Sequence, residues 1–253
     1  MAAARADALR AQCASLRCIL WDMDGVLIDV GASYRRAVVE TAASFLGKEC
    51  PPGIVTKFKN RGGYNNDWVC TKGIIDELGE GRVQVTLAEV TERFQKLYKG
   101  DNYSGYIATE PAAVDSALLA KLSAKYSMAC ATGRPRDEAM WTLRRHGWTE
   151  HIPVVVGMEQ QGEQGKPHPF PLQEAVRQLR AVSTDADSAP YAPPAQMCYL
   201  GDTGDDMRAA RAAGMIAIGC VAPNHDFEAD QRTLEDAGAQ LVLASPNELA
   251  VLL

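Results

Sequence analysis

The sequence predicts an α/β protein in which helices cover both faces of a parallel β-sheet. Six short apolar runs end at polar residues or at glycine, and segments with helical periodicity separate most of them. Runs of this length that are apolar throughout are typical of strands buried on both faces of a sheet. The expected strands are Cys18–Trp21, Met128–Ala131, Pro153–Val156, Met197–Leu200, Met215–Val221 and Leu241–Leu243.

Helix boundaries support this alternation of strands and helices. Gly147 follows the helical segment Glu138–His146, and Gly214 follows Asp206–Ala213. Glycine is common just past the last helical residue because it adopts a left-handed backbone without strain. A final helix is expected to begin at Ser245–Glu248, where a capping serine precedes a proline and a glutamate.

The alternation stops between about Asp29 and Pro111, where the periodicity is helical only. Thr86 and Glu89 form a capping box in this region, and apolar residues recur at three- and four-residue spacing. We therefore expect a helical insert at residues 30–111, a core built from residues 17–29 and 112–253, and an N-terminal extension over residues 1–16. The helices expected in the insert are Ala32–Leu46, Asn65–Leu78 and Leu87–Lys99, and a surface loop is expected at Ser183–Pro194.

Composition narrows the class of protein. The chain has 253 residues, 47% of them hydrophobic and 23% charged, which is typical of a soluble globular protein. The net charge of -6 argues against nucleic acid as a partner. No apolar stretch is long enough for a membrane span. The seven scattered cysteines indicate a reducing, cytoplasmic compartment. An organellar transit peptide is left open, and the oligomeric state is not readable.

A pair of carboxylates follows the first expected strand. Asp22 and Asp24 precede Gly25, just beyond the carboxyl end of Cys18–Trp21, where open α/β sheets bind ligands. One carboxylate can attack phosphorus as a nucleophile, and the other can protonate the leaving group and then activate water. Taken alone, the same residues also fit ordinary turn chemistry.

A second group of carboxylates follows the strand Met197–Leu200. Asp202, Asp205 and Asp206 lie in a glycine-containing turn that opens a helix. Together with the first pair, they offer the hard oxygen ligands that Mg²⁺ prefers, and a phosphate would be repelled here without such a cation. For Asp205, the preference of acidic residues for a helix N-terminus is the favoured explanation.

Two further segments suit a phosphoryl group. Thr132, Gly133 and Arg134 end the strand Met128–Ala131, and a hydroxyl with backbone N–H groups at a helix start can hold phosphoryl oxygens. Thr132 could instead only cap the following helix. Lys166 lies in a proline-rich turn before another helix, where it could stabilise charge on the phosphoryl group, although most loop lysines are solvated.

The four segments occur together in an order that resembles the haloacid dehalogenase-like hydrolases, chiefly their aspartate-nucleophile phosphatases. The resemblance implies a Rossmann-like core with a small helical cap of the family's first class at residues 30–111. It implies a phosphoric monoester hydrolase that uses Mg²⁺ and a small phosphorylated metabolite. The roles it implies are Asp22 as nucleophile and metal ligand, Asp24 as acid/base and metal ligand, Thr132 and Lys166 on the phosphoryl oxygens, and Asp202 and Asp206 at the metal.

The insert is expected to contribute substrate contacts. The segment from Arg61 to Trp68 lies where related caps carry their specificity loop, and Arg61, Asn65 and Asn66 are the candidate residues. Arg61 could bind a phosphate or carboxylate of the substrate, or it could be a solvated loop arginine. Gly133 and Arg134 are the candidate substrate-binding residues of the core.

Three other functions compete with a phosphatase. A hydrolytic dehalogenase does not need the second aspartate, Asp24. A sugar phosphomutase shares the carboxylates and Mg²⁺, but related mutases carry a histidine near the start of the first cap helix, and Ser33–Arg36 contains none. A noncatalytic binding protein on the same fold would be favoured by loss of the nucleophile, the acid or the metal carboxylate, and all are present. Hydrolysis is therefore favoured.

Overall fold

The computed structural model describes residues 15–252 except for residues 60, 62, 65 and 183–190. Most of the predicted N-terminal extension and most of the predicted loop Ser183–Pro194 therefore lie outside the described residues. The chain folds as two compact units. One unit comprises the described residues up to Asp29 together with those from Ala112 onward, and the other comprises Val30–Pro111.

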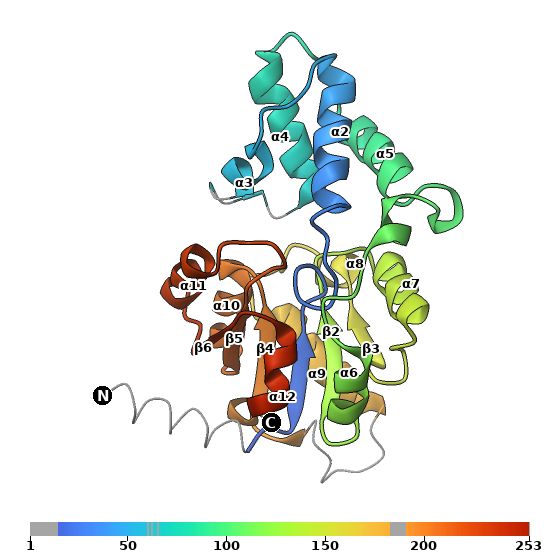
Figure 1. Cartoon of the computed structure of the whole chain (residues 1–253). Helices are drawn as coiled ribbons and strands as arrows, with labels where there is room; N and C mark the ends of the chain where they lie inside the picture. The colour runs from blue at the N-terminus through green and yellow to red at the C-terminus, as the bar shows by residue number, and fades with distance from the viewer. Residues whose placement is uncertain (1–14, 60, 62, 65, 183–190, 253) are drawn as a thin grey trace. The chain divides into compact units, whose positions relative to one another are not determined.

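A single parallel sheet forms the centre of the first unit, and it confirms the predicted fold class (Figure 1). The strand order is β3-β2-β1-β4-β5-β6. All neighbouring strands run parallel, and Cys18 of β1 is level with Ser127 of β2 and Met197 of β4. The strands are β1 Cys18–Trp21, β2 Ser127–Ala131, β3 Val154–Val156, β4 Met197–Gly201, β5 Ile216–Cys220 and β6 Leu241–Leu243.

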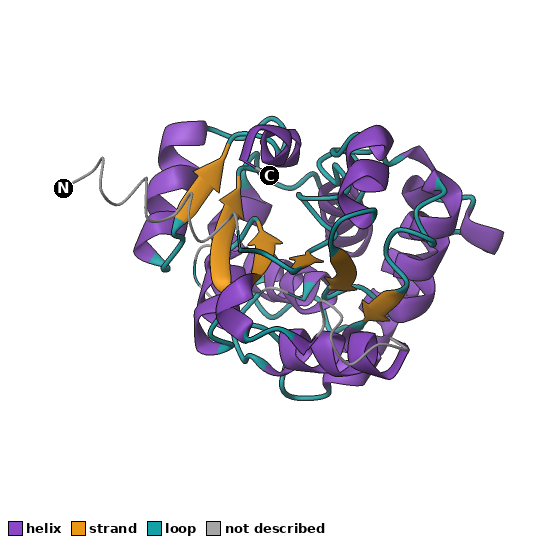
Figure 2. Ribbon diagram, turned by 90° about the horizontal axis from the view of Figure 1, so that it is seen from below, coloured by secondary structure: helices purple, strands orange, loops and turns teal. Residues whose placement is uncertain are grey.

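Helices cover both faces of the sheet (Figure 2). In Figure 1, α6 and α12 lie in front of the strands and α9 lies behind them. Alternate strand residues such as Leu20 and Ala129 belong to one buried cluster with Leu172 of α9 and Met207 of α10. The helices of this unit are α6 Ser116–Ser123, α7 Arg136–His146, α8 Met158–Gln161, α9 Phe170–Val182, α10 Gly204–Ala212, α11 Phe227–Asp236 and α12 Leu249–Leu252, with 3-10 turns η4 Pro194–Gln196 and η5 Pro246–Glu248.

The helix ends in this unit follow the predicted capping residues. Gly147 ends α7 in the left-handed conformation, with a φ of 73°. At the last helical segment, the Ser245 hydroxyl accepts a hydrogen bond from Asn247 N at 3.2 Å. The Glu248 carboxylate accepts one from Ala244 N at 3.1 Å. These contacts satisfy backbone N–H groups that have no partner inside the helix.

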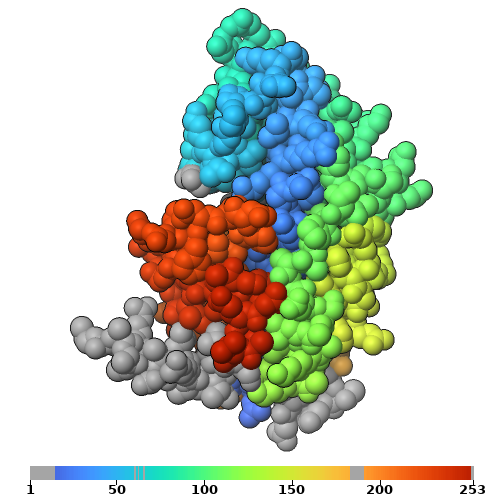
Figure 3. All heavy atoms as spheres, viewed as in Figure 1, coloured from blue at the N-terminus to red at the C-terminus, as the bar shows by residue number. Residues whose placement is uncertain are grey.

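The second unit, residues 30–111, contains helices and no strand among its described residues. Figure 3 shows the atoms of α2, α3 and α4 packed closely together on the visible side of this unit. Its first and last segments are joined, because the Ser33 hydroxyl donates to the buried carboxylate of Glu110 at 2.5 Å. Its elements are α2 Tyr34–Leu46, α3 Ile54–Lys59, α4 Asp67–Gly79, α5 Leu87–Tyr98, η1 Asp101–Tyr103 and η2 Tyr106–Thr109.

Two features of the second unit bear on the sequence predictions. The capping box of Thr86 and Glu89 is present at the start of α5, as expected. The short helix α3 was not expected. It has only six residues and ends before a second apolar period develops, so periodicity could not reveal it.

Candidate active site

The carboxyl end of β1 carries Asp22 and Asp24 into a tight turn. Asp22 N donates to Leu200 O of β4 at 2.8 Å, so the sheet fixes the backbone of Asp22 directly. Gly25 has a φ of +76°, which glycine adopts without strain. A Cβ atom at this position would lie 2.1 Å from Oδ2 of Asp202. Glycine is therefore needed for the β1 turn to approach the β4 loop.

Lys166 brings two of the aspartates together. Its ammonium nitrogen lies 3.0 Å from Oδ1 of Asp22 and 2.6 Å from Oδ1 of Asp206. The lysine side chain is 12% exposed and the two carboxylates are 7% and 0% exposed, so water screens these charges weakly. Lys166 is thus held by buried carboxylates and is not a solvated loop lysine.

Tyr199 of β4 also contacts this lysine. Its hydroxyl accepts a hydrogen bond from Lys166 Nζ at 3.0 Å. The single hydroxyl proton is shared between Ala131 O at 2.9 Å and Oδ1 of Asp206 at 3.2 Å. The Lys166 ammonium is therefore hydrogen-bonded to Tyr199 and ion-paired with Asp22 and Asp206.

Asp206 is fixed by a capping box at the start of α10. Its carboxylate accepts from Thr203 N at 3.0 Å and from the Thr203 hydroxyl at 2.6 Å. The Thr203 hydroxyl in turn accepts from Asp206 N at 3.3 Å. Asp205 points elsewhere and pairs with Arg208 at 2.8 Å. Asp205 thus lies in the first turn of α10, where acidic residues are favoured, and outside the cluster.

Three of the predicted metal carboxylates converge. Asp22, Asp202 and Asp206 each offer an oxygen atom, and these atoms lie within 4.8 Å of one another. Oδ1 of Asp22 is buried and is ion-paired with Lys166 at 3.0 Å, but it accepts no hydrogen bond among the described residues. A buried carboxylate oxygen in this position is incompletely coordinated, and a bound cation would complete its coordination. The donor set, all hard oxygens, fits a divalent cation such as Mg²⁺.

The electrostatics of the site also favour a cation. The pKa of Asp22 is raised to about 7, chiefly by burial; Lys166 opposes the rise, and Asp206 and Asp24 add to it. Asp202 keeps some exposed surface, but burial, Asp206 and Asp22 raise its pKa well above the usual range. Burial alone would lower the pKa of Lys166; Asp206 and Asp22 outweigh it and raise that pKa. The carboxylates therefore repel one another, and positive charge would relieve the repulsion.

Thr132 lies at the end of β2 and is fully buried. Its hydroxyl accepts a hydrogen bond from Arg134 N at 3.1 Å, and its backbone N donates to Val156 O at 3.0 Å. Gln161 of α8 donates to the Thr132 carbonyl at 2.6 Å. Gly133 is exposed, and a Cβ there would meet no atom within 4 Å. The loop is thus rigid at Thr132 and open at Gly133.

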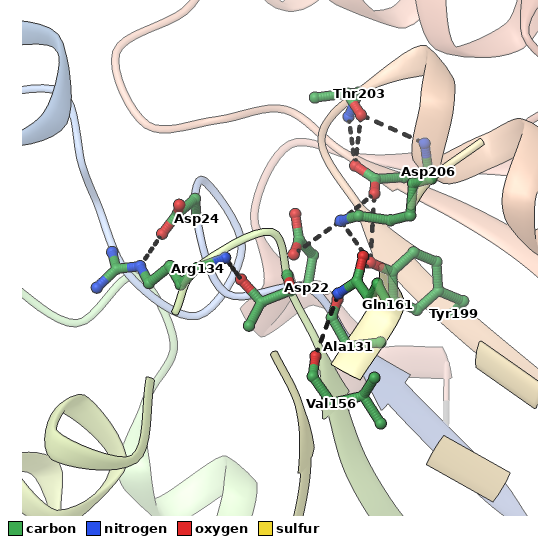
Figure 4. Close-up of polar contacts among 11 residues, drawn as sticks. Asp22, Asp24, Ala131, Arg134, Val156, Gln161, Tyr199, Thr203 and Asp206 are labelled. Carbon is green, nitrogen blue, oxygen red and sulfur yellow. Dashed lines mark hydrogen bonds and ion pairs between the residues drawn. The ribbon is translucent and has the colours of Figure 1, made fainter. Parts of the chain in front are cut away.

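Arg134 pairs with Asp24 and is itself buried. Its Nε donates to Oδ1 of Asp24, and its Nη1 donates to the Thr142 hydroxyl at 3.3 Å. Figure 4 shows Asp22 between this pair on one side and Tyr199 with Asp206 on the other. The structure therefore brings Asp22, Asp24, Arg134, Thr132, Lys166, Asp202 and Asp206 to one edge of the sheet, as the sequence predicts for strand ends.

The candidate residues of the other unit have local partners. Arg61 forms an ion pair with Glu77 and lies over the Phe58 ring at 4.5 Å. Asn66 caps α4 by accepting from Trp68 N at 2.9 Å and Val69 N at 3.1 Å. Asn65 lies outside the described residues. Substrate contacts of these three residues stay a prediction.

Sequence reasoning missed two residues that support the site, Tyr199 and Gln161. Both lie in apolar or helical segments where nothing marks their polar atoms as site contacts. The role of Thr203 was readable, because a threonine three residues before an acidic residue is a capping signature. The partner of Asp24 was not readable, since Arg134 is 110 positions away.

A parallel α/β core with an inserted helical unit and a carboxylate-rich site at its strand ends defines a class of hydrolases. The model of the haloacid dehalogenase-like hydrolases matches residues 16–214. The chain belongs to this family. The predicted enzyme class, a phosphoric monoester hydrolase, is confirmed by this match together with phosphatase relatives.

Several relatives and solved structures are similar to the chain. An imidazoleglycerol-phosphate dehydratase of Phytophthora nicotianae is 33% identical over 240 residues, which are 90% of this chain and 50% of that protein. The chain thus spans about half the length of that relative. A phosphoglycolate phosphatase of Cupriavidus necator is 29% identical over 203 residues, 79% of this chain and 80% of that protein.

Solved structures share the fold. A predicted phosphoglycolate phosphatase from Haemophilus somnus superposes with a TM-score of 0.72 at 17% identity, covering 94% of this chain and 98% of that one. A candidate β-phosphoglucomutase from Thermotoga maritima gives a TM-score of 0.66 at 24% identity, with the same coverage. Identity at this level supports the fold and not the substrate. No helix within the described residues is long and apolar enough to cross a membrane.

Proposed function

We propose that the chain hydrolyses a small phosphate monoester through an aspartyl-phosphate formed on Asp22, with Mg²⁺ bound by Asp22, Asp202, Asp206 and the backbone carbonyl of Asp24. The observation that carries the proposal is the convergence of Asp22, Asp202 and Asp206 around a buried Asp22 oxygen that lacks a hydrogen bond. The Asp22 carboxylate can therefore bind a cation through one oxygen and attack a phosphoryl group with the other.

The first half-reaction moves the phosphoryl group to the enzyme. An Asp22 oxygen forms a bond to phosphorus while the bond from phosphorus to the leaving oxygen breaks. Asp24 gives its proton to that leaving oxygen, which departs as an alcohol. Lys166 and the Thr132 hydroxyl hold the phosphoryl oxygens, and Gly133 lies in an open part of the loop where its N–H can contribute.

The second half-reaction returns the enzyme to its starting state. Asp24, now a carboxylate, takes a proton from a water molecule, and that water attacks phosphorus. The bond between phosphorus and the Asp22 oxygen breaks, inorganic phosphate leaves, and Asp22 is again a carboxylate. When bound, Mg²⁺ supplies positive charge that offsets the carboxylates and the incoming phosphoryl group. Its donors are the oxygens named above.

A metal-dependence assay of p-nitrophenyl phosphate hydrolysis tests this proposal. The dialysed protein is assayed in EDTA, with Mg²⁺, and with Mg²⁺ plus Ca²⁺. We expect activity with Mg²⁺ only, and inhibition by Ca²⁺, because the larger ion accepts more ligands and can occupy both oxygens of the nucleophile. Full activity in EDTA after thorough dialysis would refute the metal site.

The substrate is proposed only as a small phosphate ester. Relatives named phosphoglycolate phosphatase make phosphoglycolate the first candidate, and the relative named imidazoleglycerol-phosphate dehydratase makes an imidazole-bearing phosphate ester the second. A screen of sugar phosphates, amino-alcohol phosphates and these two candidates would rank them by kcat/KM.

A sugar phosphomutase is the alternative that shares the fold. The Thermotoga maritima structure supports it at the level of the fold. Product analysis separates the two functions, because a phosphatase releases inorganic phosphate in step with substrate loss. A mutase returns an isomeric sugar phosphate and releases little phosphate.

A further inference from the structure

The Arg134 side chain is a buried cation whose observed contact with the reaction machinery is Asp24. Its side chain is 0% exposed, whereas the Asp24 side chain is 30% exposed. A side chain without accessible surface cannot touch a substrate in this conformation. It can act on a substrate only through a neighbour that does reach solvent, and Asp24 is such a neighbour (Figure 4).

Both the backbone and the guanidinium of Arg134 are held by hydrogen bonds. Its backbone N donates to the Thr132 hydroxyl at 3.1 Å, and its backbone carbonyl accepts from Met158 N at 2.8 Å. Its guanidinium donates to the Thr142 hydroxyl of α7, which is itself buried. Arginine in a rigid setting loses little conformational freedom for each hydrogen bond that it forms. The contact thus restricts the rotation of the Asp24 side chain.

The contact leaves part of Asp24 available. Arg134 binds Oδ1, and Oδ2 accepts no hydrogen bond from the described residues. A proton donor must present one oxygen to the leaving group at hydrogen-bond distance, and an unanchored aspartate on a turn would sample several rotamers.

We propose that Arg134 is a positioning residue that anchors one oxygen of Asp24, so that the other faces the leaving group and later the water. This inference rests on the proposed function. It gives Arg134 a role different from the direct substrate contact that the sequence suggests, because the guanidinium contacts Asp24 from its buried side.

Leaving-group selectivity tests the inference. Arg134→Met removes the anchor, and kcat/KM is measured for p-nitrophenyl phosphate and for an alkyl phosphate. The ratio kcat/KM reports the first half-reaction. Nitrophenolate is stable enough to leave without a proton, whereas the leaving oxygen of an alkyl ester must receive a proton from Asp24. We expect a loss of roughly tenfold to a hundredfold on the alkyl ester and less than about threefold on the aryl ester. Arg134→Lys should recover part of the loss.

A double-mutant cycle separates action through Asp24 from direct action on the phosphoryl group. In an Asp24→Asn background, Arg134→Met should produce no further selective loss on the alkyl ester, because the amide that replaces the Asp24 carboxyl group has no acidic proton to donate. If Arg134→Met does not fold, Arg134→Lys is carried through the same cycle. Arg136→Gln, the loss of an exposed arginine two residues away, controls for the change in charge and should keep both activities.

Each outcome has one meaning. Equal losses on both esters, or a loss that persists in the Asp24→Asn background, would overturn the inference and place Arg134 on the phosphoryl group or in folding. Unchanged activity in Arg134→Met would also overturn it. A wild-type protein that hydrolyses neither ester would instead refute the proposed function, and the inference with it.

Discussion

The two units of the chain hold their candidate polar residues in opposite ways. In the unit with the sheet, Lys166 is 12% exposed and its carboxylate partners are 7% and 0% exposed. In residues 30–111, Arg61 is 40% exposed and its partner Glu77 is 38% exposed. Buried charges are stable only with complete partners, whereas an exposed pair contributes about 0–1 kcal/mol. The buried cluster around Lys166 therefore suits chemistry that is the same for every substrate. The exposed Arg61 can exchange Glu77 for another anion at little cost in free energy.

The largest expected effect is the loss of the nucleophile. Asp22→Asn should reduce phosphate release from p-nitrophenyl phosphate to below about 1% of the wild-type rate, a barrier increase above ~3 kcal/mol, because an amide cannot form the acyl-phosphate. Asp205→Asn is the matched control, since its carboxylate pairs with Arg208 outside the cluster. Residual activity well above that level would remove Asp22 from the nucleophile role.

The metal ligands should rank by their place in the buried cluster. Asp202→Ala removes one of three converging carboxylates and should raise the Mg²⁺ concentration for half-maximal activity by roughly tenfold to a hundredfold, whereas Asp205→Ala should shift it little. The measurement is a Mg²⁺ titration of hydrolysis at saturating ester. The reverse order of the two variants would show that the ligands are misassigned.

Arg61 tests the exposed side of the comparison. If the arginine makes a charge-assisted contact, Arg61→Ala should lower kcat/KM for the best natural ester roughly tenfold to a hundredfold. This corresponds to a loss of about 1.5–3 kcal/mol of transition-state stabilisation. Hydrolysis of p-nitrophenyl phosphate is the internal control and should change little. Parallel losses on both esters would place Arg61 in the reaction or in folding, and no loss on either would make it a solvated arginine.

Gly25 allows the smallest and most local test. Gly25→Ala and Gly147→Ala both force alanine into a positive φ, of +76° and +73° respectively, which costs about 1–2 kcal/mol of stability. Only at Gly25 would the added Cβ collide with Asp202. We expect a larger loss in Tm for Gly25→Ala than for Gly147→Ala, because of the added collision, and about a tenfold loss of activity for Gly25→Ala alone. Equal activities would mean that Asp202 can move aside.

The sequence predicts the sheet closely because the strands are short apolar runs and the central ones are buried on both faces. All six strands occur within one residue of their expected limits. The convergence of Asp22, Thr132 and Asp202 follows from the same logic, since parallel strands end at one edge. Side-chain partners do not follow from it. Whether Arg134 turns toward Asp24 or toward substrate depends on the packing of residues far apart in the chain.

The point where residues 30–111 leave and rejoin the sheet unit has a consequence for protein engineering. Ile28 and Ala112 form a β-bridge, and Ala113 N donates to Leu27 O at 2.9 Å. The two backbone ends are therefore neighbours whether or not anything long connects them, and doubling the connecting length costs only about 0.6 kcal/mol in closure entropy. This junction is a natural graft site, at which a short turn or a different helical module can replace the insert without rearranging the strands.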